Sequence, residues 1–362
     1  MRPGRAARSS IYAAFVLTLR DLNRTLLLRQ HLLERTKMPA LQMVEHLIGL
    51  QAQENLPPYL SLAARVEGFD PLELSDALER KAAVRFLTMR GTIHVLVPED
   101  ALSLRLWVQG ALDQQSASNQ ISRPAKVVPV DDLVGSTRRI LEAGSLPVKQ
   151  LKERLADEYP DVPAGALVHT ARERVPMLQV PPRGLWKQSG GVVYQTVENY
   201  LGRPTTEVDV RELVRRYLRA FGPATAADMT TWSRVTRLGP VFHAMADELL
   251  VVECEDNKLR YDVPGAPYAE GDVPAPVRLL GTYDNVWLSH ANRDHIVPVE
   301  MRSRWSGTNG GVGHTIFVDG FMAGLWWVRE GRVVTEVFRR LARREQAELD
   351  AEIAAVDALL AR

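Results

Sequence analysis

The chain of 362 residues contains a single cysteine, Cys254, which excludes a framework of intramolecular disulfide bonds. This composition is typical of proteins from the reducing cytoplasm, where we expect the protein to be located. The chain also lacks any apolar run of the ~18–20 residues that a transmembrane helix needs, so no membrane partner is predicted. Its formal net charge is only +1, so no global positive field attracts polyanions.

The first 17 residues share some features with a secretory signal peptide but lack others. Basic residues at 2–8 precede a short apolar segment, Ile11 to Leu17, which continues directly into polar sequence. The small-residue cleavage site of a signal peptide does not follow. We therefore predict that residues 1–17 are an N-terminal extension that need not be ordered.

Several common catalytic signatures are missing as well. The sequence has no P-loop, no dinucleotide-binding fingerprint and no Ser-His-Asp order. Asp284, His290, Asp294 and His295 lie close together in sequence, but without an established spacing for metal ligands. We predict neither a metal nor a cofactor.

One order of elements, helices followed by a β-hairpin, occurs three times along the chain. In the first copy, helical patterns up to Lys81 precede a β-rich segment at 84–97 with a turn at Gly91. This is the order of a winged helix, and the predicted units are 18–110, 111–206 and 207–272. Alternating β runs at 273–336 then predict a small antiparallel sheet or barrel, with a charged helix after it. The predicted fold class is α+β.

Two glutamines, Gln51 and Gln53, lie where a helical pattern ends before Pro57-Pro58. On a continuous helix, residues two apart point about 200° from each other and cannot serve one site. At a frayed end, or in an extended segment, they can. The alternative is that both amides only cap the last carbonyls of the helix.

Arg90, Thr92 and His94 alternate in the first hairpin, so we expect them on one face of a strand. They would contact phosphate or another part of a ligand near the glutamines, or form a polar hairpin face; for Thr92 the structural role is favoured. Further basic residues are candidates for contacts with backbone phosphates, with a solvated surface role as the alternative. They are Arg172, Arg174, Arg183, Lys187, Arg234 and Arg237.

A set of motifs taken together resembles the bacterial AlkZ-type DNA glycosylases. The motifs are Leu28-Arg29-Gln30-His31-Leu32-Leu33-Glu34-Arg35, Leu47-Ile48-Gly49-Leu50-Gln51-Ala52-Gln53, Pro57-Pro58-Tyr59, Met89-Arg90-Gly91-Thr92-Ile93-His94, Tyr283-Asp284-Asn285, Leu288-Ser289-His290 and Val318-Asp319-Gly320. The resemblance extends from about Thr18 to the end of the chain.

This resemblance implies three tandem winged helices and a small C-terminal β-barrel in a C-shaped body around double-stranded DNA. It implies that Gln51 and Gln53 are catalytic and that the substrates are bulky or crosslinked purines alkylated at N7 or N3. Some relatives protect antibiotic-producing bacteria from their own DNA-alkylating product. A related branch has aspartate at the second glutamine position, where this chain has Gln53. The usual large apolar residue between the glutamines is Ala52 here.

The chemistry of the amides restricts the substrate further. Glutamine cannot act as a general base, but its carbonyl can hold a water molecule and its dipole can stabilise developing positive charge. Such a pair suits cationic bases that already leave easily, and no lysine nucleophile is assigned, so we expect a monofunctional, monomeric enzyme. The competing hypotheses are a non-enzymatic winged-helix regulator and a damage-recognition scaffold without catalysis.

Overall fold

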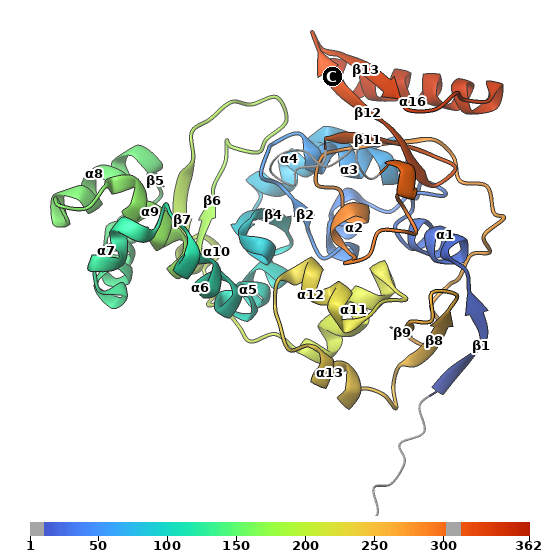
Figure 1. The fold of residues 1–362 in the computed structure, drawn as a ribbon. Helices are drawn as coiled ribbons and strands as arrows, with labels where there is room; N and C mark the ends of the chain where they lie inside the picture. The colour runs from blue at the N-terminus through green and yellow to red at the C-terminus, as the bar shows by residue number, and fades with distance from the viewer. Residues whose placement is uncertain (1–10, 302–312) are drawn as a thin grey trace, which may run out of the picture.

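Helices and short strands alternate through residues 11–301 and 313–362, the part of the chain that the computed structural model describes. The strands form three separate sheets (Figure 1). The predicted α+β class is therefore confirmed. Among the helices of this part of the chain, none combines the length and hydrophobicity that a membrane crossing requires.

The first unit supplies the stretch with the two glutamines. Its first helix begins after Thr18, which forms a capping box with Asp21. Pro57 and Pro71 open two further helices, because the first turn of a helix does not need their missing N–H groups. The elements in chain order are α1 (Leu19–Arg29), α2 (Ala40–His46), β2 (Leu50–Gln51), α3 (Pro57–Arg65), α4 (Pro71–Glu79), β3 (Val84–Leu87), η1 (Met89–Gly91) and β4 (Ile93–Leu96).

Most of the second unit lies at one end of the molecule (Figure 1). Many of its buried apolar side chains, between Ala125 and Tyr194, form a cluster of their own, whereas Leu178, Val180 and Leu185 belong to the cluster of the first unit. Helices followed by a hairpin are present in the predicted order. Helix α5 (Pro98–Trp107) closes the first unit, and its buried apolar residues belong to the first cluster. The elements that follow it are α6 (Gln109–Ser118), η2 (Arg123–Val127), α7 (Val130–Glu142), β5 (Leu146–Pro147), α8 (Val148–Glu158), α9 (Ala164–Arg174), β6 (Met177–Gln179), β7 (Val193–Thr196) and α10 (Val197–Leu201).

The hairpins of the first two units join in one six-stranded sheet of order β2-β4-β3-β6-β7-β5. Strands β3 and β6 are antiparallel, with Arg85 opposite Gln179 and Phe86 opposite Leu178. The second hairpin is thus built into a sheet that contains the strand of Gln51.

The connection between β6 and β7, which contains the predicted DNA contacts Arg183 and Lys187, packs on the first unit. The ring of Trp186 lies 4.9 Å from that of Tyr59, measured between centroids. The Tyr59 hydroxyl donates a hydrogen bond of 2.7 Å to the carbonyl of Gly184. The backbone N–H of Trp186 donates to the Ser75 hydroxyl at 2.8 Å. Burial of the aromatic ring against α3 and α4 explains this docking.

The third unit also ends in a hairpin, and its sheet contains part of the predicted N-terminal extension. Residues 11–17 form β1 (Ile11–Leu17), which pairs parallel with β8, so this half of the extension is an ordered edge strand; residues 1–10 lie outside the described part. The elements of the unit are α11 (Val210–Phe221), α12 (Ala226–Ser233), α13 (Gly239–Ala244), β8 (Leu250–Cys254) and β9 (Leu259–Asp262).

The C-terminal region is an open sheet in the described residues, which corrects the prediction of a barrel. The four strands follow the order β10-β11-β12-β13, so β10 and β13 are not paired with each other. Side chains of α16 hold both edges: Glu348 accepts the Val277 N–H at 3.1 Å and Asp357 accepts the Val333 N–H at 2.8 Å. The elements are β10 (Arg278–Leu280), α14 (Asn285–Leu288), η3 (Val299–Met301), β11 (His314–Val318), β12 (Phe321–Arg329), β13 (Arg332–Val337) and α16 (Arg343–Ala361).

Buried ion pairs fasten the C-terminal region and the third unit to the first. Arg65 of α3 and Asp284 form two hydrogen bonds of 2.7 and 2.8 Å with both side chains fully buried. Arg29 of α1 holds Asp262 of β9 in the same bidentate way, at 2.8 and 2.9 Å. Buried apolar residues of these three parts form one continuous cluster. The glutamine stretch is therefore set in the largest core.

Candidate active site at the glutamine pair

The backbone leaves the helix before it reaches the glutamines. Helix α2 ends at His46, and Ile48 and Gly49 then adopt positive φ angles of 53° and 95° that reverse the chain. Gly49 is required here, because a Cβ at this position would meet Leu96 at 2.4 Å. Gln51 follows in the short strand β2.

Both glutamine side chains turn toward strand β4 and its preceding turn. In the antiparallel register, Gln51 lies opposite His94, and the Ala52 N–H continues the ladder to the Ile93 carbonyl at 2.7 Å. The amide oxygen of Gln53 accepts the Ile93 N–H at 3.3 Å. Gln51 is 6% exposed and Gln53 is an exposed residue. The extended backbone thus allows two residues two positions apart to face one region.

The helix-capping alternative does not describe this geometry. Among the described residues, neither glutamine side chain binds a carbonyl of α2. The carbonyl oxygens of Leu47 and Gly49 are met instead by Nδ2 of Asn285, at 3.5 and 3.1 Å. The C-terminal region therefore provides the cap and leaves the two amides for other partners.

The predicted strand face of Arg90, Thr92 and His94 is wrong for two of the three residues. Only His94 lies in β4; Arg90 is in the η1 turn with a left-handed φ of 57°. Thr92 closes the same turn through a hydrogen bond of 3.1 Å from its hydroxyl to the Met89 carbonyl, which is the structural role favoured for it. The turn extends one residue beyond Gly91, so the alternation of a strand does not apply to Arg90.

Arg90 and His94 nonetheless meet beside Gln51. Nη2 of Arg90 lies 3.0 Å from Oε1 of Gln51 and 2.9 Å from Nε2 of His94. Nη1 of Arg90 donates to the backbone carbonyl of Trp232, at the end of α12. Three separate elements, β2, β4 and α12, therefore converge on one guanidinium.

Burial determines the charge states in this cluster. His94 is 1% exposed, and burial together with the Arg90 guanidinium holds the pKa of His94 well below its usual range, so the ring is neutral at pH 7. Burial and then the nearby charge of Arg234 lower the pKa of Arg90 to about 9. The guanidinium therefore keeps its charge at neutral pH.

A further residue, Arg85, holds the backbone between the glutamines. Its Nη2 donates a hydrogen bond of 2.8 Å to the Ala52 carbonyl, and the residue is only 2% exposed. Burial, followed by the charge of Arg183, lowers the pKa of Arg85 to about 10. Arg85 was not predicted as a site residue. The available signal was a single charged residue within an otherwise apolar strand.

The predicted DNA contacts fall into two groups. Arg234 and Arg237 are exposed and follow α12 directly, and Arg234 is close enough to lower the pKa of Arg90. In the second unit, Arg174 of α9 pairs with Asp113, Arg172 is half-buried, and Lys187 is exposed beside Trp186. Arg183 is half-buried, with Nη1 at 3.4 Å from the Gly190 carbonyl.

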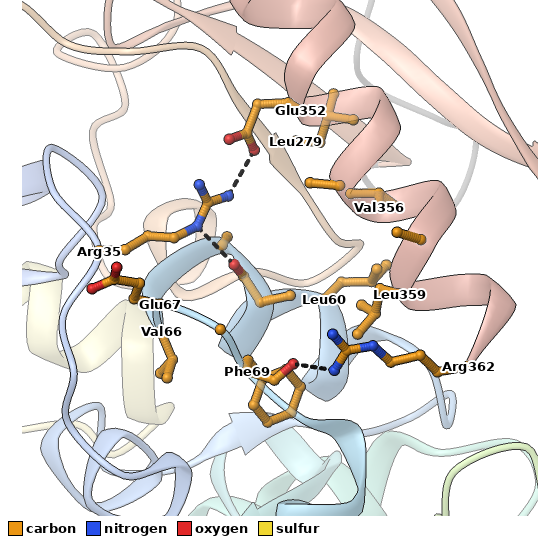
Figure 2. A pocket seen from close by; sticks show the side chains of 15 residues that line it. Arg35, Leu60, Val66, Glu67, Phe69, Leu279, Glu352, Val356, Leu359 and Arg362 are labelled. Carbon is orange, nitrogen blue, oxygen red and sulfur yellow. Dashed lines mark hydrogen bonds and ion pairs between the residues drawn. The ribbon is translucent and has the colours of Figure 1, made fainter.

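A separate cavity lies between α3 and α16 (Figure 2). It has a volume of about 360 Å³ and an apolar wall that includes Leu60 and Val356. Arg35 at its rim pairs with Glu352 at 2.9 Å. None of Gln51, Gln53, Arg90 and His94 lines it. In the described residues, moreover, His, Cys, Asp and Glu side chains do not gather in the groups of three or more that a metal site needs.

Comparison with known proteins gives one family. The family model described as DNA glycosylase AlkZ-like matches residues 44–359. The interstrand DNA cross-link repair glycosylase of Streptomyces sahachiroi is 26% identical over 352 residues, which cover 91% of this chain and 92% of that protein. The solved structure of Streptomyces sahachiroi DNA glycosylase AlkZ has the same fold, with a TM-score of 0.79 at 23% identity over 96% of this chain and 98% of that one.

Proposed function

Because the chain belongs to the AlkZ-like family of DNA glycosylases, we propose that it hydrolyses the N-glycosidic bond of alkylated purines in double-stranded DNA. The substrates would be bulky or crosslinked purines substituted at N7 or N3. The name of the Streptomyces relative, which describes repair of interstrand crosslinks, supports the inclusion of crosslinks. A role in resistance to a genotoxic natural product belongs to the same proposal.

The observation that carries this proposal is the chemistry of the groups around Gln51 and Gln53. In the described structure their hydrogen-bond partners are Arg90 and the backbone N–H of Ile93, and no carboxylate takes part. His94 is buried and its Nε2 already faces Arg90. A site without a general base can only assist the departure of a base that leaves readily.

An N7-alkylated guanine is such a base, because its positive charge is neutralised when the glycosidic bond breaks. The sugar that remains has the character of an oxocarbenium ion, as in glycoside hydrolysis. Amide dipoles can position a water molecule and stabilise the developing charge without any proton transfer. Since no lysine contacts the pair in the described residues, we assign a monofunctional hydrolysis without a Schiff base.

DNA would approach from the side of the exposed arginines. Arg234 and Arg237 are the best placed of the predicted contacts, because they follow the α12 end that binds Arg90. Guanidinium groups suit phosphate, and such contacts set register rather than sequence preference. We propose that tandem winged helices carry a monomeric enzyme on the duplex in the cytoplasm. A bulky lesion would then be reached without enclosure in a deep pocket, in contrast to base-flipping enzymes.

The test compares cationic and neutral bases in otherwise identical duplexes. One duplex carries N7-methylguanine, a second carries a bulky N7 adduct, and two others carry uracil or hypoxanthine. Abasic products are cut with alkali and quantified against protein-free controls. We expect cleavage only at the alkylated guanines. No product above the spontaneous rate at either adduct would contradict the enzyme assignment and favour a non-enzymatic DNA-binding protein.

A further inference from the structure

We propose that Arg90 and His94 are positioning residues that lock the amide of Gln51 in one orientation, with its oxygen held and its amino group turned to the substrate. This inference rests on the proposed glycosylase function and assigns distinct roles to the two glutamines. It replaces the direct DNA contact that the sequence suggested for Arg90 and His94.

The orientation follows from the donor inventory of the cluster. A guanidinium has only donors, so the atom of Gln51 that lies 3.0 Å from Nη2 of Arg90 must be the oxygen. The second hydrogen of Nη2 points to Nε2 of His94 at 2.9 Å, and that nitrogen must therefore be the acceptor. The imidazole proton is then on Nδ1, which lies 3.1 Å from the Thr92 carbonyl. Each hydrogen bond in this chain has one possible direction.

Arg90 is held in its position at a considerable cost in free energy. It adopts a left-handed φ of 57°, which is unfavourable for a residue with a side chain. Its Nε is enclosed and without a hydrogen-bond partner, and no ion pair joins it to a carboxylate within the described residues. Arg29 and Arg65, by contrast, are buried against Asp262 and Asp284. The burial of Arg90 is therefore not compensated by a charge partner of this kind.

The two glutamines therefore have different roles toward the water molecule, one as a hydrogen-bond donor and the other as an acceptor. The oxygen of Gln51 accepts from a cation, so it is a poor acceptor for water and a poor stabiliser of positive charge. No described residue binds the amino group of Gln51, which can therefore donate to the oxygen of a nucleophilic water. Gln53 is exposed, and its oxygen makes one hydrogen bond of 3.3 Å, which leaves a lone pair for a water hydrogen. Gln53 is therefore the acceptor of the pair.

The experiment measures single-turnover excision of N7-methylguanine at saturating enzyme, together with DNA affinity and the thermal midpoint. The variant Arg90→Ala should lose about 100-fold in rate, the magnitude typical of one lost preorganised group, with little change in DNA affinity. Guanidinium ion added at millimolar concentration should restore part of that rate. It should not restore the rate of Gln51→Ala, in which the acceptor is missing.

Arg105→Ala is the matched control. Arg105 is a buried arginine without an ion pair among the described residues, and it also donates to a glutamine oxygen, that of Gln109, at 2.5 Å. It lies in α5, outside the cluster around Gln51. Its loss should lower the thermal midpoint and leave the saturating rate unchanged, with no response to guanidinium.

Gln51→Glu is a second variant, which creates no cavity. The carboxylate keeps an oxygen for Arg90 and removes the amino donor, so the fold should be retained and the rate lost. Wild-type rates for Gln51→Glu or Arg90→Ala would overturn the inference. So would a loss in Arg90→Ala that disappears at saturating enzyme, because that is the behaviour of a phosphate contact. A wild-type protein that is inactive on this DNA contradicts the proposed function itself.

Discussion

Nη2 of Arg85 donates a hydrogen bond of 2.8 Å to the carbonyl oxygen of Ala52, the residue between the two glutamines. Ala52 is fully buried, and its N–H is held by the Ile93 carbonyl. Both backbone polar groups of the central residue are therefore fixed from strands β3 and β4. The pair of amides is presented by a backbone that has little freedom, as preorganised sites require.

Gly184 of the second unit supports this arrangement, so Gly184→Ala should disturb it. A Cβ at Gly184 would lie 2.4 Å from Cδ of Arg85, and φ is already +93°. We expect Arg85 to shift from Ala52 and the excision rate to fall about tenfold or more, since small displacements of catalytic groups have large effects on rate. Gly202→Ala is the control, because its φ of +68° is also left-handed but nothing lies within 4 Å. Equal rates for the two variants would contradict this role of Gly184.

Asp284→Asn should destabilise the protein strongly. The substitution leaves the fully buried guanidinium of Arg65 without its charge partner, and such a loss typically costs ~3–5 kcal/mol. Thermal unfolding followed by circular dichroism measures the effect. Glu153→Gln removes the charge of the exposed Lys149–Glu153 pair and should change stability by no more than ~0.5 kcal/mol. Similar midpoints for both variants would show that the buried pair does not fasten the C-terminal region.

The excision rate should depend little on pH between about pH 6 and about pH 8. Neither glutamine titrates, and burial beside Arg90 holds the pKa of His94 well below its usual range, so His94 stays neutral throughout. Arg90, with a pKa of about 9, stays charged over the same interval. Single-turnover rates, corrected for spontaneous loss of the base, should vary by less than about twofold. A tenfold fall toward acid pH would reveal a general base that this site does not contain.

The stability of the fold should decline in acid because of the same histidine. Its pKa is lower in the folded protein than in the unfolded chain, so the unfolded state binds more protons below pH ~6.5. The contribution of neutral His94 to stability is fully present above pH ~6.5 and is lost as the pH falls toward the pKa of His94 in the folded protein. The free energy of unfolding of the wild-type protein and of His94→Asn can be measured by urea unfolding at neutral and acid pH. The wild-type free energy should fall more steeply with decreasing pH. Parallel slopes would mean that His94 is protonated in the folded protein.

The local elements could be predicted from the sequence because their signals are local. Apolar periodicity and flanking turns located the hairpin at 84–97 to within a few residues. The helical pattern before Pro57 was extended too far, because α2 ends at His46 and the chain then reverses at Ile48 and Gly49. The positive φ of Ile48 had no signal, because β-branched residues rarely adopt it.

The parts that could not be predicted depend on contacts between distant segments. Arg85 reaches the motif within its own unit, but its packing against Gly184 depends on the second unit. The open C-terminal sheet depends on α16, whose Glu348 and Asp357 bind the strand edges. The position of Arg90 depends on the length of the turn before β4. One of the two interpretations of the first hairpin placed Arg90 and His94 near the glutamines, but neither predicted that Arg90 binds Gln51.

The most direct measurement is single-turnover excision of one bulky N7-alkylguanine from a duplex by the wild-type protein and by the Gln51→Ala, Gln53→Ala double variant. We predict that the wild-type protein exceeds the spontaneous rate and that the double variant falls by at least about 100-fold, with its circular dichroism spectrum and DNA affinity retained. A double variant that excises the base at the wild-type rate would contradict the catalytic role of the glutamine pair.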